Sequence, residues 1–315
     1  MKTKIKDALF APFTYLSAVW LRKVRANIRT MKLSKKILMK AGVFPILDRY
    51  WEPLFNPAHL RYSLRKDRAL PGIDFNIKEQ IELLGKFKFN EELEKIPLEK
   101  TGRDGPEFYY NNGAFEAGDA EYLYNIVRLI KPARIVEIGG GNSTLMIENA
   151  LAANKRDDAR YECSHLCVEP YECQWLEKLP VKIIRSRVEE ADKEIFLKLE
   201  KNDMLFIDSS HVIRPQGDVL LEYLEILPLL KPGVIAHIHD IFTPKDYPDK
   251  WVRDEVRLWN EQYLVEAFLT LNGAYKIIGS LNYLKHNYFD ELAKACPILK
   301  KNPDREPASF YIARR

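Results

Sequence analysis

The chain has 315 residues, which suggests about two domains at roughly 150 residues each. Hydrophobic residues make up 46% and charged residues 30%, a balance that is ordinary for a globular chain and excludes collagen-like and wholly disordered classes. No run of about 18 apolar residues occurs, which argues against a polytopic membrane protein, and four cysteines are too few for a disulfide scaffold and fit a reducing compartment.

The formal net charge of +4 is divided unevenly along the chain. Residues 1–40 hold eleven bases and one acid, Asp7, so this segment carries +10 and the rest of the chain carries −6. A strongly basic terminus on an acidic body predicts an anionic partner, such as phospholipid, nucleic acid or another protein.

Residues 9–21 form an apolar stretch with bases on both sides. As a helix it would reach only about 20 Å, which is short of a hydrocarbon core of roughly 30 Å. No signal-peptide cleavage site is evident, and Phe13, Tyr15 and Trp20 beside bases are typical of an interfacial helix. We expect residues 1–40 to be a basic amphipathic segment on an anionic membrane surface. The alternative is that its aromatic residues pack on the body while its bases are solvated.

Residues 41–117 are expected to form a helical accessory layer or lid, which prolines divide into short pieces. Asn76 and Glu79 have the spacing of a capping box, which predicts a helix from Asn76 to about Lys86. Residues 108–115 are aromatic and polar and contain a glycine, so they are either a lid over a site or an ordinary loop.

Residues 118–315 alternate between apolar strands and helices. Strands are predicted at 134–139, 165–169, 181–185, 204–208, 234–240, 275–281 and 309–313, and helices at 120–131 (capped by Asp119), 143–153, 219–230 and 251–271. This alternation predicts an α/β fold, with a doubly wound and mostly parallel sheet covered on both faces.

The carboxyl ends of the predicted strands carry polar residues, and ligands of such sheets bind outside those ends. The residues concerned are Glu137, Gly139, Gly140, Gly141, Asn142 and Ser143 after the first strand, Glu169 after the second, Asp208 and His211 after the fourth, and His237, His239 and Asp240 at the fifth. The sequence therefore predicts a site at this edge.

The glycines at 139–141 allow a tight turn and the close approach of a ligand. The loop departs from the dinucleotide fingerprint at Thr144 and lacks the G-K-[ST] of a P-loop. Glu137 suits a cationic amino group better than a pyrophosphate, and Glu169 is placed to accept hydrogen bonds from a ribose. A cation and a ribose without phosphates describe S-adenosylmethionine.

The sequence EIGGGNS at 137–143 resembles motif I of class I S-adenosylmethionine-dependent methyltransferases, [DE]-x-G-x-G-x-G, with Ser143 in place of the last glycine. Glu169 matches the acidic residue after their second strand, and the two C-terminal strands fit their final antiparallel strand. The resemblance covers 118–315 and implies a seven-stranded, Rossmann-like catalytic domain there. It implies donor contacts from Glu137, Gly139, Gly140, Gly141, Asn142, Ser143, Glu169 and Asp208.

Residues 206–211 and 236–240 resemble a subgroup of small-molecule O-methyltransferases that includes enzymes acting on antibiotic sugars. The resemblance implies an Mg²⁺ site at Asp208 and Asp240, with His239 as the third ligand. Because a hydroxyl is a poor nucleophile until it loses its proton, we predict His211 as general base, with Asp208 as the second catalytic residue. A zinc site at Cys163, His165, Cys167 and Cys173 is disfavoured, since the spacing contains no C-x₂-C pair.

These residues predict an O-methyltransferase that acts on a small molecule or a glycan, in cell-surface polysaccharide or natural-product biosynthesis. Two alternatives stay open: a non-methylating, hydroxylase-like relative on the same fold, and an RNA methyltransferase. Nucleic acid is disfavoured as a partner because the body is acidic and lacks the Asn-Pro-Pro-Tyr and Pro-Cys motifs of base methyltransferases. We expect a cytoplasmic protein, peripheral at the inner face of the membrane through residues 1–40, which can form a homo-oligomer.

Overall fold

The computed structural model describes residues 2–102, 105–171 and 173–315. The chain forms two compact units, Met1–Ser63 with Lys250–Leu258, and Leu64–Asp249 with Trp259–Arg315. The accessory region expected at 41–117 is thus shared between the units. Its first part belongs with the basic N-terminus, and the remainder belongs with the α/β domain.

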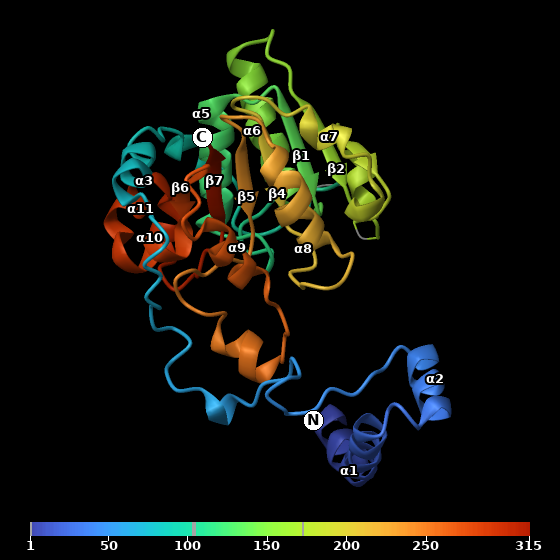
Figure 1. Ribbon diagram of the computed structural model, residues 1–315. Helices are drawn as coiled ribbons and strands as arrows, with labels where there is room; N and C mark the ends of the chain where they lie inside the picture. The colour runs from blue at the N-terminus through green and yellow to red at the C-terminus, as the bar shows by residue number, and fades with distance from the viewer. Residues whose placement is uncertain (1, 103–104, 172) are drawn as a thin grey trace. The chain divides into compact units, whose positions relative to one another are not determined.

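The elements follow one another along the chain as helices first and then as alternating strands and helices (Figure 1). The α-helices are α1 (Lys2–Ala26), α2 (Lys32–Ala41), α3 (Ile77–Leu84), α4 (Asn90–Leu93), α5 (Asp119–Ile130), α6 (Asn142–Asp157), α7 (Glu194–Leu197), α8 (Asp218–Leu221), α9 (Glu261–Leu269), α10 (Leu281–Asn287), α11 (Phe289–Ala295) and α12 (Pro297–Lys301). The strands are β1 (Arg134–Ile138), β2 (Ser164–Val168), β3 (Lys182–Ile184), β4 (Met204–Ile207), β5 (Ile235–Ile238), β6 (Tyr275–Ser280) and β7 (Phe310–Arg314). Short 3₁₀ or π turns lie at Pro57–His59, Gln174–Lys178, Val188–Glu190, Glu222–Ile226, Leu227–Leu229 and Lys250–Asp254.

The seven strands form one sheet in the order β3-β2-β1-β4-β5-β7-β6. Strands β1 to β5 are parallel to their neighbours, and β7 is inserted antiparallel between β5 and β6. This arrangement confirms the predicted mostly parallel sheet and its final antiparallel strand. It also brings the carboxyl ends of β1, β2, β4 and β5 to one edge.

Both faces of the sheet are covered, which explains why its strands are almost continuously apolar. Ile135 and Phe206 pack with α5, α6 and α10–α12 on one face, whereas Val136 and Leu205 pack with α7, α8 and α9 on the other. Successive strand residues point to opposite faces, so each strand contributes to both cores.

Three local predictions were wrong. Gly118, not Asp119, caps α5, because the Asp119 carboxylate accepts hydrogen bonds from the backbone N–H groups of residues 308 and 309. Asn76 makes no side-chain cap and instead donates to the carbonyl of Ile277. The helix expected at 251–271 is α9 alone, since residues 250–258 belong to the other unit. Sequence reasoning also missed α10–α12.

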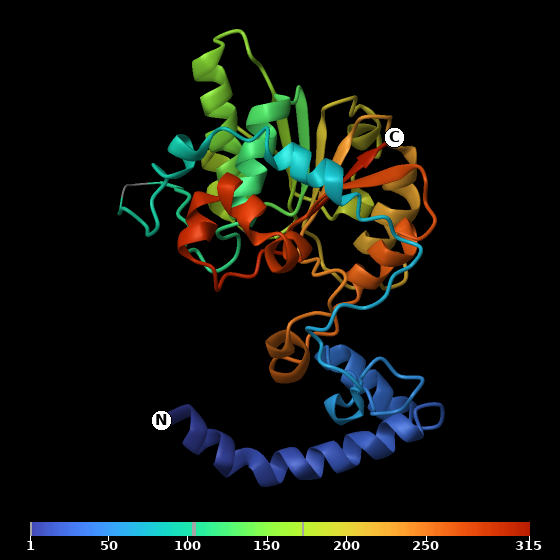
Figure 2. The ribbon, with the colours of Figure 1, turned by 90° about the vertical axis from the view of Figure 1, so that its left-hand side faces the viewer.

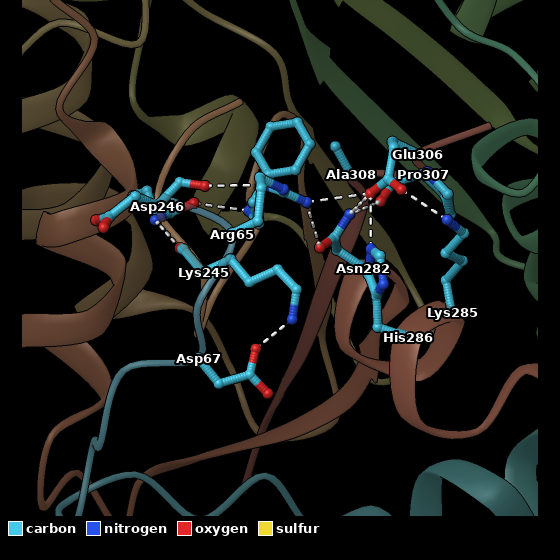
Figure 3. Close-up of polar contacts among 12 residues, drawn as sticks. Arg65, Asp67, Lys245, Asp246, Asn282, Lys285, His286, Glu306, Pro307 and Ala308 are labelled. Carbon is cyan, nitrogen blue, oxygen red and sulfur yellow. Dashed lines mark hydrogen bonds and ion pairs between the residues drawn. The ribbon is translucent and has the colours of Figure 1, made fainter. Parts of the chain in front are cut away.

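Polar contacts tie residues 65–68 to the loop that follows β5 (Figure 3). Arg65 donates to the carbonyl of Asp246 at 3.0 Å and to the carboxylate of Glu306 at 3.1 Å. Lys245 pairs with Asp67. Asn282, Lys285 and His286 also bind Glu306. The segment that enters the α/β domain therefore fixes the loop next to Asp240.

The N-terminal unit contains α1, α2, an irregular segment up to Ser63, and residues Lys250–Leu258. Arg25 near the end of α1 forms an ion pair with Glu52 at 3.1 Å and lies over the ring of Phe44. Figure 2 shows α1 as one long helix. None of the described helices is long and apolar enough to cross a membrane.

Candidate active site

A cavity of about 510 Å³ lies at the carboxyl ends of β1, β2 and β4. Four of the predicted donor-site residues line it, namely Gly139, Gly140, Glu169 and Asp208. The structure does not bring Glu137, Gly141, Asn142 or Ser143 to the wall of this cavity, so direct donor contacts from those four residues remain predictions.

The glycine loop is held against the strands beneath it. Gly139 has φ +83°, and a Cβ there would lie 2.0 Å from the carbonyl oxygen of Asp208. A Cβ on Gly140 would lie 2.5 Å from the Cys167 sulfur, whereas one on Gly141 would have no atom within 4 Å. Only glycine fits at 139 and 140 for reasons internal to the fold. At Gly141, the open space leaves room for a ligand.

Glu169 links the loop to the end of β2. Its carboxylate accepts the N–H of Gly140 at 3.1 Å and the N–H of Tyr171 at 2.9 Å. Each carboxylate oxygen has two lone pairs and can accept more than one hydrogen bond.

Glu137 lies behind the loop, fully buried, where one oxygen accepts the Ser143 hydroxyl at 3.0 Å. Its other oxygen lies 2.9 Å from Nε2 of His165, and Nδ1 of that ring lies 2.6 Å from Glu148. Burial lowers the pKa of His165, but the hydrogen bonds to Glu137 and Glu148 outweigh it and raise this pKa to about 9. Glu137 therefore orients the start of α6 through Ser143.

A second group of side chains lies at the ends of β4 and β5. His211 Nε2 is 3.2 Å from Asp208 and 3.5 Å from Asp240, and the three ligand atoms lie within 4.8 Å of one another. Nδ1 of the same ring is 2.8 Å from the fully buried carboxylate of Glu261, which also accepts the hydroxyl of Tyr223. His211 and Asp240 adopt positive φ angles, 59° and 58°, an uncommon conformation that often marks functional sites.

The carboxylates and imidazoles of this cluster shift one another's pKa values. Burial lowers the pKa of His211, but hydrogen bonds to Asp208 and Glu261 raise it well above the ordinary value. Burial raises the pKa of Asp208, but the charges of His239 and His211 outweigh it and hold this pKa at about 2. These contacts hold the His211 ring between two carboxylates, and its role as general base stays a prediction.

The three potential ligand atoms that lie close together come from Asp208, His211 and Asp240, so ligation by His239 stays a prediction. His239 Nε2 is 3.6 Å from Asp240, and its ring packs against Phe115. His237, on the same face of the strand, stacks on Phe206 and bonds to Ser309, so it is structural.

The aromatic segment 108–115 is mostly packed into the core. Phe108, Tyr110 and Phe115 are all buried, and the exposed positions are confined to its tip around Gly113. This packing favours the reading as an ordinary loop over that of an open lid.

Sequence reasoning missed several residues of this region. Tyr171 and Arg187 line the cavity beside Glu169, and the guanidinium donates to the tyrosine hydroxyl at 2.7 Å. Glu261 lay inside a segment expected to be plain helix. The motif-like context of Glu169 could have drawn attention to Tyr171, but no local signal marks Glu261.

The chain is similar to known proteins in both sequence and structure. Residues 136–241 match the sequence profile of a family described as "Methyltransferase domain". An uncharacterized protein of Archaeoglobus fulgidus is 29% identical over 175 residues, which span 51% of this chain and 75% of the relative.

Two solved structures are similar at low sequence identity. An O-methyltransferase from Bacillus cereus in complex with SAH is 12% identical, with a TM-score of 0.38, over 76% of this chain and 91% of that one. The O-methyltransferase TomG from Streptomyces achromogenes, in complex with SAM, is 14% identical, with a TM-score of 0.34, over 74% and 89%.

Proposed function

We propose that this chain is a methyltransferase that takes its methyl group from S-adenosylmethionine and transfers it to a hydroxyl group of a small molecule or a glycan. The match of residues 136–241 to a methyltransferase domain and the strand order of the sheet support this proposal. The observation that carries the proposal is the position of Asp208. This residue lines the donor cavity and also belongs to the carboxylate–imidazole cluster with His211 and Asp240. A donor and an acceptor held by these two neighbouring features would meet at Asp208.

The residues that line the donor cavity support its use by S-adenosylmethionine. Gly139 and Gly140 line the cavity together with Glu169, whose carboxylate would accept a hydrogen bond from a ribose hydroxyl. Tyr171 and Arg187 offer a ring and a planar cation beside Glu169, which suits an adenine base. Glu137 and Ser143 contribute by fixing the turn into α6.

The acceptor side fits a divalent cation. Two carboxylates and one imidazole converge within a distance that one ion can span, and the imidazole turns its other nitrogen to Glu261. Histidine ligands of metals usually donate their second N–H to a carboxylate in this way. The mixed oxygen and nitrogen donors favour Mn²⁺ or a similar transition ion over the Mg²⁺ expected from the family resemblance.

A bound cation would lower the pKa of an acceptor hydroxyl. Asp208 and Asp240 would hold the acceptor oxygen near the donor. His211, with Nδ1 on Glu261, is fixed in orientation and would present Nε2 to the same place. Methyl transfer itself depends on in-line positioning more than on covalent help, and the rigid rim of the sheet provides that positioning.

The test combines donor binding with turnover. S-adenosylhomocysteine should bind the full-length protein in isothermal titration, and radiolabelled donor should label hydroxylated acceptors from a panel of nucleotide sugars, glycolipids and phenols. Asp240→Asn should abolish labelling while S-adenosylhomocysteine affinity stays within a few fold, because Asp240 lies outside the donor cavity wall.

Two results would contradict the proposal at different points. Failure of S-adenosylhomocysteine to bind would refute the use of the donor cavity. Donor binding together with labelling of RNA or protein, but of no small molecule or glycan, would refute the acceptor class alone.

A further inference from the structure

We propose that α1 is a membrane-surface anchor, which lies in the plane of an anionic bilayer with one apolar face in the lipid. This inference goes beyond the methyl transfer and does not depend on it. It concerns the N-terminal unit, and it takes up the first of the two interpretations of residues 1–40 given above.

The first observation is a continuous apolar stripe along α1. Ile5, Leu9, Phe13, Leu16 and Trp20 recur at intervals of three or four residues and therefore lie on one face of the helix. Their exposed fractions are 64%, 69%, 68%, 65% and 50%. The rest of the N-terminal unit thus leaves this face uncovered, although packing against the helix reaches Val24 near its end.

The second observation is the placement of charge at both ends of the stripe. Lys6 lies next to its first residue, and Arg22 and Lys23 follow its last, while Asp7 is the sole acid of residues 1–40. (The side chains of Lys2 and Lys4 lie outside the described residues.) Bases at the ends of an apolar helix can reach lipid phosphates while the stripe enters the acyl region.

The neighbouring helix repeats the pattern. In α2, Leu33 and Ile37 are 73% and 59% exposed at a spacing of four residues, and the helix also carries four lysines, at 32, 35, 36 and 40. No residue of α2 is buried. Two consecutive helices with exposed apolar and basic faces point to one kind of partner.

Geometry and charge favour a lipid surface over other occupants. The apolar stretch is too short to span a bilayer, and α1 does not qualify as a spanning helix. A second copy of the chain would bring another segment of charge +10 against the first, which opposes dimerisation through this face. The basic residues would attract RNA, but the phosphate backbone of RNA offers no apolar surface to cover a stripe of Ile, Leu and Phe side chains.

The decisive experiment compares two variants that add the same charge to the same helix. Leu16→Glu places a carboxylate at the centre of the stripe. Thr14→Glu places one on nearly the opposite side, since each helical residue advances about 100°. Thr14 is exposed and bonds only locally, to the carbonyl of Phe10. Circular dichroism would verify that both full-length variants keep the helix content of the wild-type chain.

Co-flotation with vesicles measures binding. The wild-type chain should float with vesicles of phosphatidylcholine and phosphatidylglycerol and stay unbound with pure phosphatidylcholine. Leu16→Glu should weaken partitioning by about tenfold or more, since it removes one buried leucine and inserts a charge. Thr14→Glu should weaken it by only about fivefold, the effect of one unit of charge at the surface.

Several outcomes would overturn the proposal. Equal losses from Leu16→Glu and Thr14→Glu would show that the stripe does not enter lipid. An absence of wild-type flotation on anionic vesicles would refute the anchor directly. If Leu16→Glu instead dissociates a dimer in sedimentation analysis, or if RNA retains the protein and vesicles do not, another partner covers this face.

Discussion

The buried triad of Glu137, His165 and Glu148 makes the stability of the α/β domain depend on pH in a defined direction. The pKa of His165 is 6.5 in its ordinary state and about 9 in the folded protein. Because the folded value is the higher one, the protonated imidazole stabilises the fold. This contribution is present in full below about pH 6.5 and is lost as the pH rises through 9.

The structure also sets the magnitude of this effect. A difference of about 2.5 pKa units corresponds to about 3 kcal/mol, at 1.36 kcal/mol per unit. Solvent screens the interaction between His165 and Glu137 very little, because the His165 side chain is 1% exposed and Glu137 is fully buried.

The assay is urea denaturation of the wild-type chain and of His165→Gln at intervals from pH 6 to pH 9.5. The free energy of unfolding of the variant is subtracted from that of the wild type at each pH, so that titrations common to both cancel. The difference should shrink by about 3 kcal/mol across this range. His59→Gln, which alters an exposed histidine, should follow the wild-type profile.

A difference between wild type and His165→Gln that stays flat, or that grows with pH, would refute the reasoning. It would mean that His165 is neutral in the folded protein and that the carboxylates hold their own protons. An NMR titration of the His165 ring would then show the midpoint at or below its ordinary value.

Three further predictions concern the site. Gly139→Ala should lower the melting temperature and weaken S-adenosylhomocysteine binding by at least about tenfold, because its Cβ meets a carbonyl at 2.0 Å, whereas Gly141→Ala should keep the melting temperature. Calorimetry on both variants checks the contrast. His211→Gln should abolish binding of Mn²⁺ in titration calorimetry, whereas His239→Gln should retain it, because His211 and not His239 belongs to the three-ligand cluster. Loss of Mn²⁺ binding in His239→Gln alone would instead identify His239 as the ligand. Arg187→Gln should weaken S-adenosylhomocysteine binding several-fold, and an unchanged affinity would remove Arg187 from the donor site.

Much of the α/β domain was determined by local sequence patterns. Apolar runs at 134–139 and 204–208 predict β1 and β4 because strands covered on both faces bury almost every side chain. The glycines after β1 and the acid after β2 predict the donor cavity, because parallel strands place their carboxyl ends at one edge. The sequence pattern was therefore sufficient to predict the fold and part of the donor site.

The cluster around His211 was decided by tertiary structure alone. His211 and Glu261 are 50 residues apart, and α9 brings them together only after it packs beside the π turn that carries Tyr223. The same holds for His165, whose partners Glu137 and Glu148 come from a neighbouring strand and from α6. Periodicity reports which face of an element is buried, but it does not report which polar groups share that interior. Side-chain partners and their pKa values depend on strand order and helix packing, and these are properties of the assembled fold.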